Sequence, residues 1–289
     1  MSGGSEKTVY HEVEWTAETI QRYWDFVAAN SAGEDSYFSK KFARRIVGMA
    51  RRHGRLLDPV VDMGCGLGFL TEELLRRGQR VTAIDSSASS VERVRERLGS
   101  GDGRLDTRVG ELERIPVEDG AAGSLFLIEV LEHLPPEGRD RVASEVARVV
   151  RPGGCLVLTT PNEEDLDAKK VACPECGCVF HRVQHMQRMD AETLQKLLDR
   201  HGFEHIESAV EVLDPQDQKE NTKFLQKELE AEEEDREFSN QFRAHCHRTF
   251  RNSFVTYLKS APNVRQRKMR YQMEIQRRYR NYVGLQLPE

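Results

Sequence analysis

The sequence predicts an α/β domain built on a doubly wound, mostly parallel β-sheet, with N-terminal helices before it and a charged helical C-terminal extension after it. Two observations carry this prediction. Between residues 57 and 212, short apolar strands alternate with segments whose apolar residues recur at helical spacing. The first strand also runs directly into a glycine-rich turn and a helix, and sheets of this kind bind ligands at such turns.

The pattern divides the 289 residues into three parts. We expect residues 1–56 to form helices that cap the ligand site. Residues 57–215 are expected to form the sheet domain, which includes a Cys/His-rich loop at 171–187. Residues 216–289 form the charged extension, and its last strand candidate is 282–287.

Capping residues and apolar spacing define the individual elements. Thr16 is a candidate N-cap for the first helix, and a second helix is expected from Tyr37 to Arg52. Asp190 and Gly202 are the expected N-cap and C-cap of the last helix in the sheet domain. The expected strands are Val60 to Asp62, Arg80 to Asp85, Asp106 to Val109, Ser124 to Val130, Cys155 to Thr160 and Glu204 to Val212.

The turn after the first strand spans Asp62 to Gly68 and reads D-M-G-C-G-L-G. Glycines at alternate positions let the chain turn tightly and approach a ligand closely, and the following helix offers unpaired backbone N–H groups. The spacing does not match the dinucleotide pattern G-x-G-x-x-G, because its third glycine would fall at Phe69 or Thr71. The turn therefore disfavours NAD as the ligand.

Acidic residues end the second and third strands. Asp85 ends the second strand, and a carboxylate there can accept hydrogen bonds from both hydroxyls of a ribose. Glu111 follows the third strand and can accept from an exocyclic amine, while Leu112 can flank a purine ring. Taken alone, each acidic residue could be a simple turn residue, but together with the glycine spacing they predict a nucleoside ligand.

Five runs at strand ends resemble the class I S-adenosylmethionine-dependent methyltransferase family, whose fold is Rossmann-like. These runs are Val60 to Gly68, Ala83 to Asp85, Gly110 to Leu112, Leu127 to Leu134 and Arg151 to Gly154. The resemblance covers residues 35–212 and implies S-adenosylmethionine as the cofactor. The residues it implies for cofactor binding are Asp62, Gly64, Cys65, Gly66, Gly68, Asp85, Ser86, Glu111, Leu112 and Ile128.

The same resemblance implies a part of the cofactor for each group of residues. Asp62 and the glycines would hold the methionine moiety, and Asp85 the ribose. Glu111 and Leu112 would hold the adenine. In one respect the sequence departs from the family, because a seventh strand normally follows the sixth. Either the charged helices are inserted before a last strand at 282–287, or that strand is missing.

The fourth strand leads into Glu129, Glu132 and His133, which are the expected catalytic residues. Methyl transfer to a hydroxyl needs an in-line geometry and either a base or a metal for the oxygen. The run resembles two metal-dependent O-methyltransferase groups, one acting on the 3′-terminal 2′-hydroxyl of small RNAs and one on catechol-type hydroxyls in ubiquinone synthesis. Both groups add a histidine after the fifth strand, so a catalytic divalent metal is one alternative. In the other, His133 acts alone as a base or has no catalytic role.

The loop after the fifth strand carries a second candidate metal site. Cys173, Cys176, His181 and His185 form a C-x₂-C-x₄-H-x₃-H pattern, which suits a structural zinc ion, with Cys178 as a substitute ligand. The two metal hypotheses compete for His185. If zinc takes both histidines, the carboxylate site loses its fourth ligand, and spacing alone leaves this open.

The C-terminal extension holds most of the excess charge. Residues 217–237 carry nine acidic and four basic residues, whereas residues 243–280 carry eleven basic residues and one acidic residue. We expect an acidic helix lying against a basic one. The alternatives are that the basic helix holds a polyanion, or that these helices form a homodimer.

Composition narrows the classes of function. The formal net charge of −5 argues against a basic nucleic-acid binder, and no segment reaches the roughly 20 apolar residues of a membrane span. The N-terminus lacks the pattern of a signal peptide, so we expect a cytoplasmic protein. The expected function is methyl transfer to a hydroxyl of a small molecule or glycan. The alternatives are RNA 2′-O-methylation, with nucleic acid as the less favoured acceptor, and a non-catalytic cofactor-binding scaffold.

Overall fold

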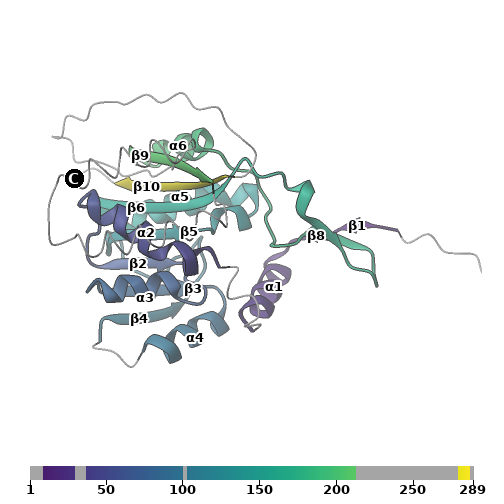
Figure 1. The fold of residues 1–289 in the computed structure, drawn as a ribbon, viewed down its shortest axis with the longest axis horizontal. Helices are drawn as coiled ribbons and strands as arrows, with labels where there is room; N and C mark the ends of the chain where they lie inside the picture. Colours follow the sequence, from purple (N-terminus) through teal and green to yellow (C-terminus); the bar gives the residue numbers. More distant parts are fainter. Residues whose placement is uncertain (1–8, 30–36, 100–102, 213–278, 287–289) are drawn as a thin grey trace, which may run out of the picture.

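The computed structural model describes residues 9–29, 37–99, 103–212 and 279–286, and within these the side chains of 206–212 and 279–286 are not described. A seven-stranded sheet with the order β4-β3-β2-β5-β6-β10-β9 forms the centre of the molecule (Figure 1). Its strands are β2 (Val60–Met63), β3 (Val81–Asp85), β4 (Leu105–Val109), β5 (Ala122–Ile128), β6 (Val150–Asn162), β9 (Glu204–Val212) and β10 (Tyr279–Gln286).

The first five strands of the sheet domain pair in parallel, as the alternation of strands and helices predicts. β10 lies between β6 and β9 and is antiparallel to both. The strand expected at 282–287 is thus a strand at Tyr279–Gln286, and it fills the place of the seventh strand. The expected acidic and basic helices, and the homodimer through them, fall on residues 213–278, which lie outside the described residues.

Helices cover both faces of the sheet. α2 (Phe38–Arg52), α3 (Phe69–Arg76) and α4 (Ala88–Leu98) lie on one face, and α5 (Arg139–Val149) and α6 (Ala191–Arg200) on the other. On the first face Ile46 of α2 packs with Val157 of β6. On the second face Val146 and Leu197 pack with Leu156. Strands buried on both faces account for the continuous apolar runs in β5 and β6.

An arm projects from the sheet where its parallel strands end (Figure 1). It is a small sheet of the order β1-β8-β7, made of β1 (His11–Glu12), β7 (Lys170–Ala172) and β8 (Cys178–His181). The segment expected as a Cys/His-rich loop therefore contains a β-hairpin, and the N-terminal chain adds a strand to it. Short 3₁₀ turns complete the described elements: η2 (Leu131–His133), η3 (Pro136–Gly138) and η4 (Asp167–Lys169).

The helix α1 (Ala17–Ala29) links the arm to the main sheet domain. Asp25 accepts a hydrogen bond from Ser87 Oγ at 2.7 Å, on the cofactor side of the expected site. Trp24 Nε1 donates to Gln184 Oε1 at 2.9 Å, on the side of the arm. The two predicted N-caps are confirmed, because the side chains of Thr16 and Asp190 accept hydrogen bonds from backbone N–H groups at the starts of α1 and α6. No helix among the described residues is both long and apolar enough to cross a membrane.

Candidate functional site

The glycine turn lies at the carboxyl end of β2, against the neighbouring strand. The backbone N–H groups of Gly64 and Cys65 both donate to Ile84 O, at 2.8 and 3.0 Å. Gly66 has a φ of 51°, which favours glycine. A Cβ built on Gly66 would lie 2.9 Å from Tyr37 Cε1, and one on Gly64 would lie 2.5 Å from Val130 Cγ2. The turn therefore needs glycine both for its backbone conformation and for the side chains packed on it.

Asp85 organises the turn through its carboxylate. Its Oδ2 accepts from the backbone N–H of Gly66 and its Oδ1 from that of Ser87, each at 2.9 Å. Burial raises the pKa of Asp85, while these two hydrogen bonds oppose the shift. The charge of Glu111 raises the same pKa further, so the two acidic strand ends lie near each other as the sequence predicts. Glu111 is exposed, and Leu112 packs against the core.

Asp62 is buried, with 2% of its surface exposed, and it accepts a hydrogen bond from Thr71 Oγ1 at 2.5 Å. Burial raises the pKa of Asp62 to about 7. The contact fastens the end of β2 to the first turn of α3, so Asp62 has a structural role whether or not it touches a ligand. Cys65 and Ile128 are also buried, whereas Ser86 is half-buried beside Asp85.

A second group of polar residues follows β5. Glu132 and His133 belong to η2, and the segment that carries His185 lies against this turn. The backbone N–H of Met186 donates to Glu132 O at 2.8 Å, and Gln184 Nε2 donates to His133 O at 2.9 Å. One potential ligand atom from each of Glu132, His133 and His185 lies within 4.8 Å of the others, and we call these residues the acceptor cluster.

The acceptor cluster adjoins the glycine turn, because Val130 packs on Gly64 two residues before Glu132. Glu129 lies at the end of β5 with a φ of 56°, and its backbone N–H donates to Thr159 O at 3.0 Å. Its carboxylate is not part of the acceptor cluster. The sequence thus predicts two of the three cluster members as catalytic residues, and the structure adds His185 in place of Glu129.

Hydrogen bonds define the tautomers of the two cluster histidines. His133 Nδ1 donates to the carbonyl of Gln184 at 3.3 Å, since a carbonyl can only accept. His185 Nδ1 is hydrogen-bonded to the carboxylate of Glu164. Burial raises the pKa of Glu164, but the hydrogen bonds and charges of His185 and Lys169 together lower it to about 2. Glu164 is therefore ionised and accepts, so in its neutral form each of the two histidines presents Nε2 as a free electron pair.

Burial and neighbouring charges keep the imidazole of His133 neutral and make the carboxyl group of Glu132 easier to protonate. Burial, followed by the charge of His185, lowers the pKa of His133 to about 3. Burial raises the pKa of Glu132 to about 7, and the charge of His185 opposes this. Among the described residues, neither carboxylate oxygen of Glu132 has a hydrogen-bond partner, and Glu132 Oε1 lies 4.0 Å from His133 Nε2. Two free imidazole nitrogens and an unsatisfied buried carboxylate fit a divalent cation.

His181 is held differently from His185. Its Nδ1 accepts a hydrogen bond from the backbone N–H of His185 at 3.0 Å. A neutral imidazole that accepts at Nδ1 carries its proton on Nε2, and this atom lies 3.9 Å from Glu164 Oε1. His181 therefore cannot offer Nε2 as a metal ligand while this hydrogen bond exists, and it supports the backbone that carries His185.

The zinc set expected from the spacing of Cys173, Cys176, His181 and His185 is not assembled. Among the described residues, the potential metal-binding groups with atoms within 4.8 Å contain His181 and His185 but no cysteine. The physical reason is strand alternation: Cys178 and His181 are three positions apart in β8 and face opposite sides of the arm. Both histidines turn toward the main sheet, whereas the cysteines stay at the tip of the arm.

Four residues missed by sequence reasoning also line the site. Tyr37 covers the glycine turn, and burial, followed by the charge of Asp85, raises its pKa to about 12. The ring of Trp24 lies edge-on to the ring of His133, with the centroids 4.7 Å apart. Glu164 and Gln184 orient the two cluster histidines. No motif marks these residues, because each acts through a contact between segments distant in sequence.

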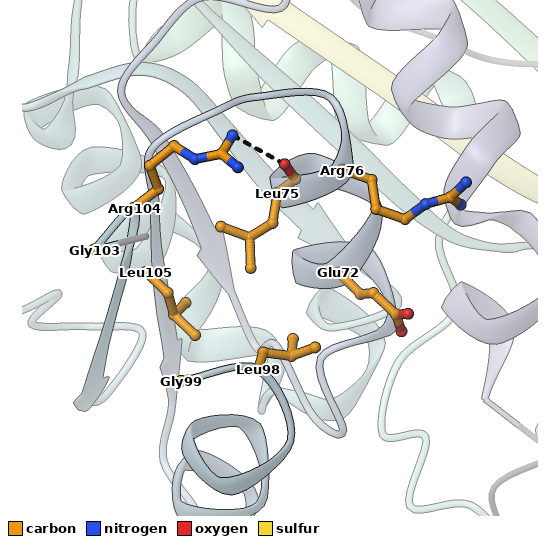
Figure 2. A pocket seen from close by; sticks show the side chains of 8 residues that line it. All are labelled: Glu72, Leu75, Arg76, Leu98, Gly99, Gly103, Arg104 and Leu105. Carbon is orange, nitrogen blue, oxygen red and sulfur yellow. Dashed lines mark hydrogen bonds between the residues drawn. The ribbon is translucent and has the colours of Figure 1, made fainter. Parts of the chain in front are cut away.

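A cavity of about 320 Å³ lies elsewhere in the molecule (Figure 2). It opens between α3, the end of α4 and the start of β4, where Arg104 Nη1 donates to Leu75 O at 3.1 Å. This is the amino end of a parallel strand, whereas Asp85 and the acceptor cluster lie at carboxyl ends. Ligands of open α/β sheets bind at the carboxyl ends, so this cavity is not the functional site.

Comparison with known proteins indicates the kind of domain to which this sheet belongs. Residues 60–154 match the family model of a methyltransferase domain. The ubiquinone biosynthesis O-methyltransferase of Xanthomonas oryzae pv. oryzae is 36% identical over 104 residues, which cover 36% of this chain and 43% of that protein. The carboxy-S-adenosyl-L-methionine synthase of Chromohalobacter salexigens is 35% identical over 135 residues, which cover 42% of this chain and 49% of that protein. The chain spans about half the length of these curated relatives.

A solved structure shows the same fold. Phosphoethanolamine N-methyltransferase 2 of Haemonchus contortus, in complex with S-adenosyl-L-methionine, matches with a TM-score of 0.55 and 13% sequence identity, over 93% of this chain and 60% of that one. The sheet order and the glycine turn define a Rossmann-like domain of the methyltransferase class. The family model and the curated relatives support a class I S-adenosylmethionine-dependent methyltransferase domain in this part of the chain. The glycine turn and the carboxylate of Asp85 beside it fit this cofactor.

Substituting Gly66 tests the glycine turn directly. We expect Gly66→Ala to bind S-adenosylmethionine at least about tenfold more weakly, because the new Cβ meets Tyr37 and shifts the turn. Gly54→Ala is the matched control, since Gly54 has a φ of 64° but no atom within 4 Å of its Cβ position. Both variants lose roughly 1–2 kcal/mol of stability from the left-handed backbone. Isothermal titration of both variants with S-adenosylmethionine separates the effect of backbone strain, which both share, from the steric effect at Gly66. Equal affinities of the two variants would contradict the assignment of the glycine turn to the cofactor site.

Proposed function

We propose that this protein transfers the methyl group of S-adenosylmethionine to a hydroxyl oxygen of a small molecule, and that the acceptor cluster holds a divalent cation beside that oxygen. The observation that carries the proposal is the set of free Nε2 atoms on His133 and His185 facing the buried carboxylate of Glu132. Such a set suits a hydroxyl acceptor, because a hydroxyl oxygen is a weak nucleophile until its proton is removed or polarised.

The cofactor would lie over the glycine turn. Asp85 lies at the end of the neighbouring strand, where its carboxylate can accept hydrogen bonds from ribose hydroxyls. Glu111 follows β4, where it would contact the adenine. Because Val130 packs on the turn, the cofactor's methyl group and the acceptor cluster would face the same space.

The residues of the acceptor cluster orient the acceptor. Glu164 and the carbonyl of Gln184 bind the Nδ1 atoms of His185 and His133, which leaves both Nε2 atoms as the candidate ligand atoms. A divalent cation bound there would lower the pKa of the acceptor hydroxyl, so that its proton is lost to water. Transfer then forms an O–CH₃ bond and breaks the S–CH₃ bond, leaving S-adenosylhomocysteine. Trp24, with its ring against His133, covers this space from α1.

The ubiquinone biosynthesis O-methyltransferase among the relatives is consistent with an oxygen acceptor. The carboxy-S-adenosyl-L-methionine synthase match supports the cofactor fold without favouring an oxygen acceptor. A second mechanism remains for the same site, in which His133 acts as a general base without a metal. Its pKa of about 3 makes it neutral but a weak base, so the metal-assisted mechanism is favoured.

The test is a transfer assay with methyl-labelled S-adenosylmethionine and a fractionated cell extract. We expect label in the small-molecule fraction as an O-methyl product. We also expect the label to disappear after metal chelation and to return when a divalent cation is added back. Label that is lost on nuclease treatment would indicate that the acceptor is RNA and not a small molecule. Label on nitrogen, or activity that survives complete chelation, would contradict the proposed chemistry.

A further inference from the structure

Three residues of the arm form a row that the sequence pattern does not reveal. β8 lies between β1 and β7, and Cys178 of β8 is the register partner of His11 in β1. Cys173 directly follows β7, and its backbone N–H donates to Cys178 O at 2.8 Å. His11, Cys178 and Cys173 therefore lie side by side across three neighbouring strands, about 4.8 Å apart from strand to strand.

The three residues of this row lie on one face of the arm. Side chains alternate between faces along a strand, so Phe180 shares the face of Cys178, and its ring contacts that of Trp15 with the centroids 6.4 Å apart. On the opposite face Lys170 Nζ donates to Glu12 Oε1 at 2.8 Å. Glu12 adjoins His11 in β1, so this contact confirms the alternation.

Cys176 joins the row through the turn of the hairpin. Gly177 closes this turn with a φ of 75°, and its backbone N–H donates to Cys173 O at 2.9 Å. Cys173 and Cys176 flank this one tight turn, and two cysteines separated by two residues in a glycine turn are a common half of a zinc site.

We propose that Cys173, Cys176, Cys178 and His11 bind one zinc ion at the tip of the arm. Three thiolates and one imidazole form a tetrahedral set that leaves no position for a substrate, so the site is structural. His11 Nδ1 donates to Glu12 O at 3.3 Å, which leaves Nε2 as the ligand atom. In the structure the ligand atoms of these four residues do not all lie within 4.8 Å of one another. The side chains are exposed or half-buried, however, and a change of χ1 rotamer moves each ligand atom by a few ångströms to close the set.

The proposed zinc ion would fasten the N-terminal strand to the hairpin, and thereby place α1 over the acceptor cluster. β1 leads into α1, whose Tyr23 hydroxyl donates to Arg182 O at 3.0 Å and whose Trp24 contacts His133. This zinc site is separate from the cation proposed for methyl transfer, since the two sites share no residue. The two proposals can therefore succeed or fail independently.

Cobalt substitution tests the zinc site in the full-length chain. The protein is prepared without a histidine tag, under a thiol reductant, and its zinc is replaced by Co²⁺. We expect an intense thiolate-to-cobalt charge-transfer band and tetrahedral d–d bands in the unchanged chain. Cys176→Ser is expected to weaken the charge-transfer band and release the zinc, and His11→Asn to shift the d–d bands.

Substitutions of residues outside the proposed ligand set serve as controls. Glu12→Gln changes the adjacent residue on the opposite face and should leave both sets of bands unchanged. His181→Asn and His185→Asn should also retain the charge-transfer band, because they lie outside the proposed ligand set. The absence of a thiolate band, a stable disulfide in place of metal, or a His11→Asn spectrum identical to that of the unchanged chain would overturn the proposal.

Discussion

We expect Glu132→Gln to transfer methyl groups roughly 100 to 1,000 times more slowly than the unchanged chain, while it binds S-adenosylmethionine with unchanged affinity. The amide keeps the size of the side chain but removes its charge. Glu132 is 1% exposed, so no water can replace the lost carboxylate as a partner of the cation. His185→Asn should lose a similar factor, because Nε2 of His185 is the second of the free electron pairs.

Single-turnover rates at saturating cofactor measure this effect, and isothermal titration checks that binding is retained. Glu137→Gln is the matched control, since Glu137 is exposed in η3 five residues away. Glu164→Gln should have an intermediate effect of about 10- to 100-fold, because Glu164 acts only through the orientation of His185. A Glu132→Gln protein within a few-fold of normal activity would exclude the acceptor cluster from the reaction.

The second large effect concerns the cofactor. We expect Asp85→Asn to weaken the binding of S-adenosylmethionine about 100-fold, which corresponds to about 3 kcal/mol. The carboxylate of Asp85 accepts from the backbone of Gly66 with one oxygen and of Ser87 with the other. An amide has only one acceptor oxygen, so its NH₂ group would face a backbone N–H, and it also lacks the charge that favours ribose hydroxyls.

Titration with both S-adenosylmethionine and S-adenosylhomocysteine measures this loss, and the two ligands should be weakened equally because Asp85 lies away from the transferred methyl group. Asp106→Asn is the control, because Asp106 is an exposed residue of β4 that pairs with Arg108. If Asp85→Asn weakened only the binding of S-adenosylmethionine, a contact between Asp85 and the ribose would be contradicted. Unchanged affinity for both ligands would exclude Asp85 from the cofactor site.

The cofactor half of the site could be predicted from sequence because it depends on local order. Gly66 lies at the end of one strand and Asp85 at the end of the next, and parallel pairing brings the two ends together without any further information. Glu111 follows the same rule on β4. The position of each residue therefore follows from the strand that it ends and from the handedness of the strand–helix–strand connections.

The acceptor half could be predicted only in part. Glu132 and His133 are adjacent in sequence and stand out as a motif, but their partner His185 is selected by contacts across about 50 residues of chain, such as that between Met186 and Glu132. Spacing left open whether His185 joins Glu132 and His133 or pairs with His181 as a zinc ligand. The hydrogen bond at His181 Nδ1 instead gives His181 a supporting role.

The sequence by itself determined the order of strands and helices, the glycine turn, the acidic strand ends and the family, because each of these depends on periodicity or on short motifs. Only the tertiary structure decided which histidine joins Glu132, which cysteines share a face with His11, and where β10 enters the sheet. These features depend on register between distant strands and on the alternation of side chains. A shift of one residue in the pairing of a strand moves every side chain of that strand to the opposite face of the sheet. The spacing of residues along the sequence does not reveal such a shift.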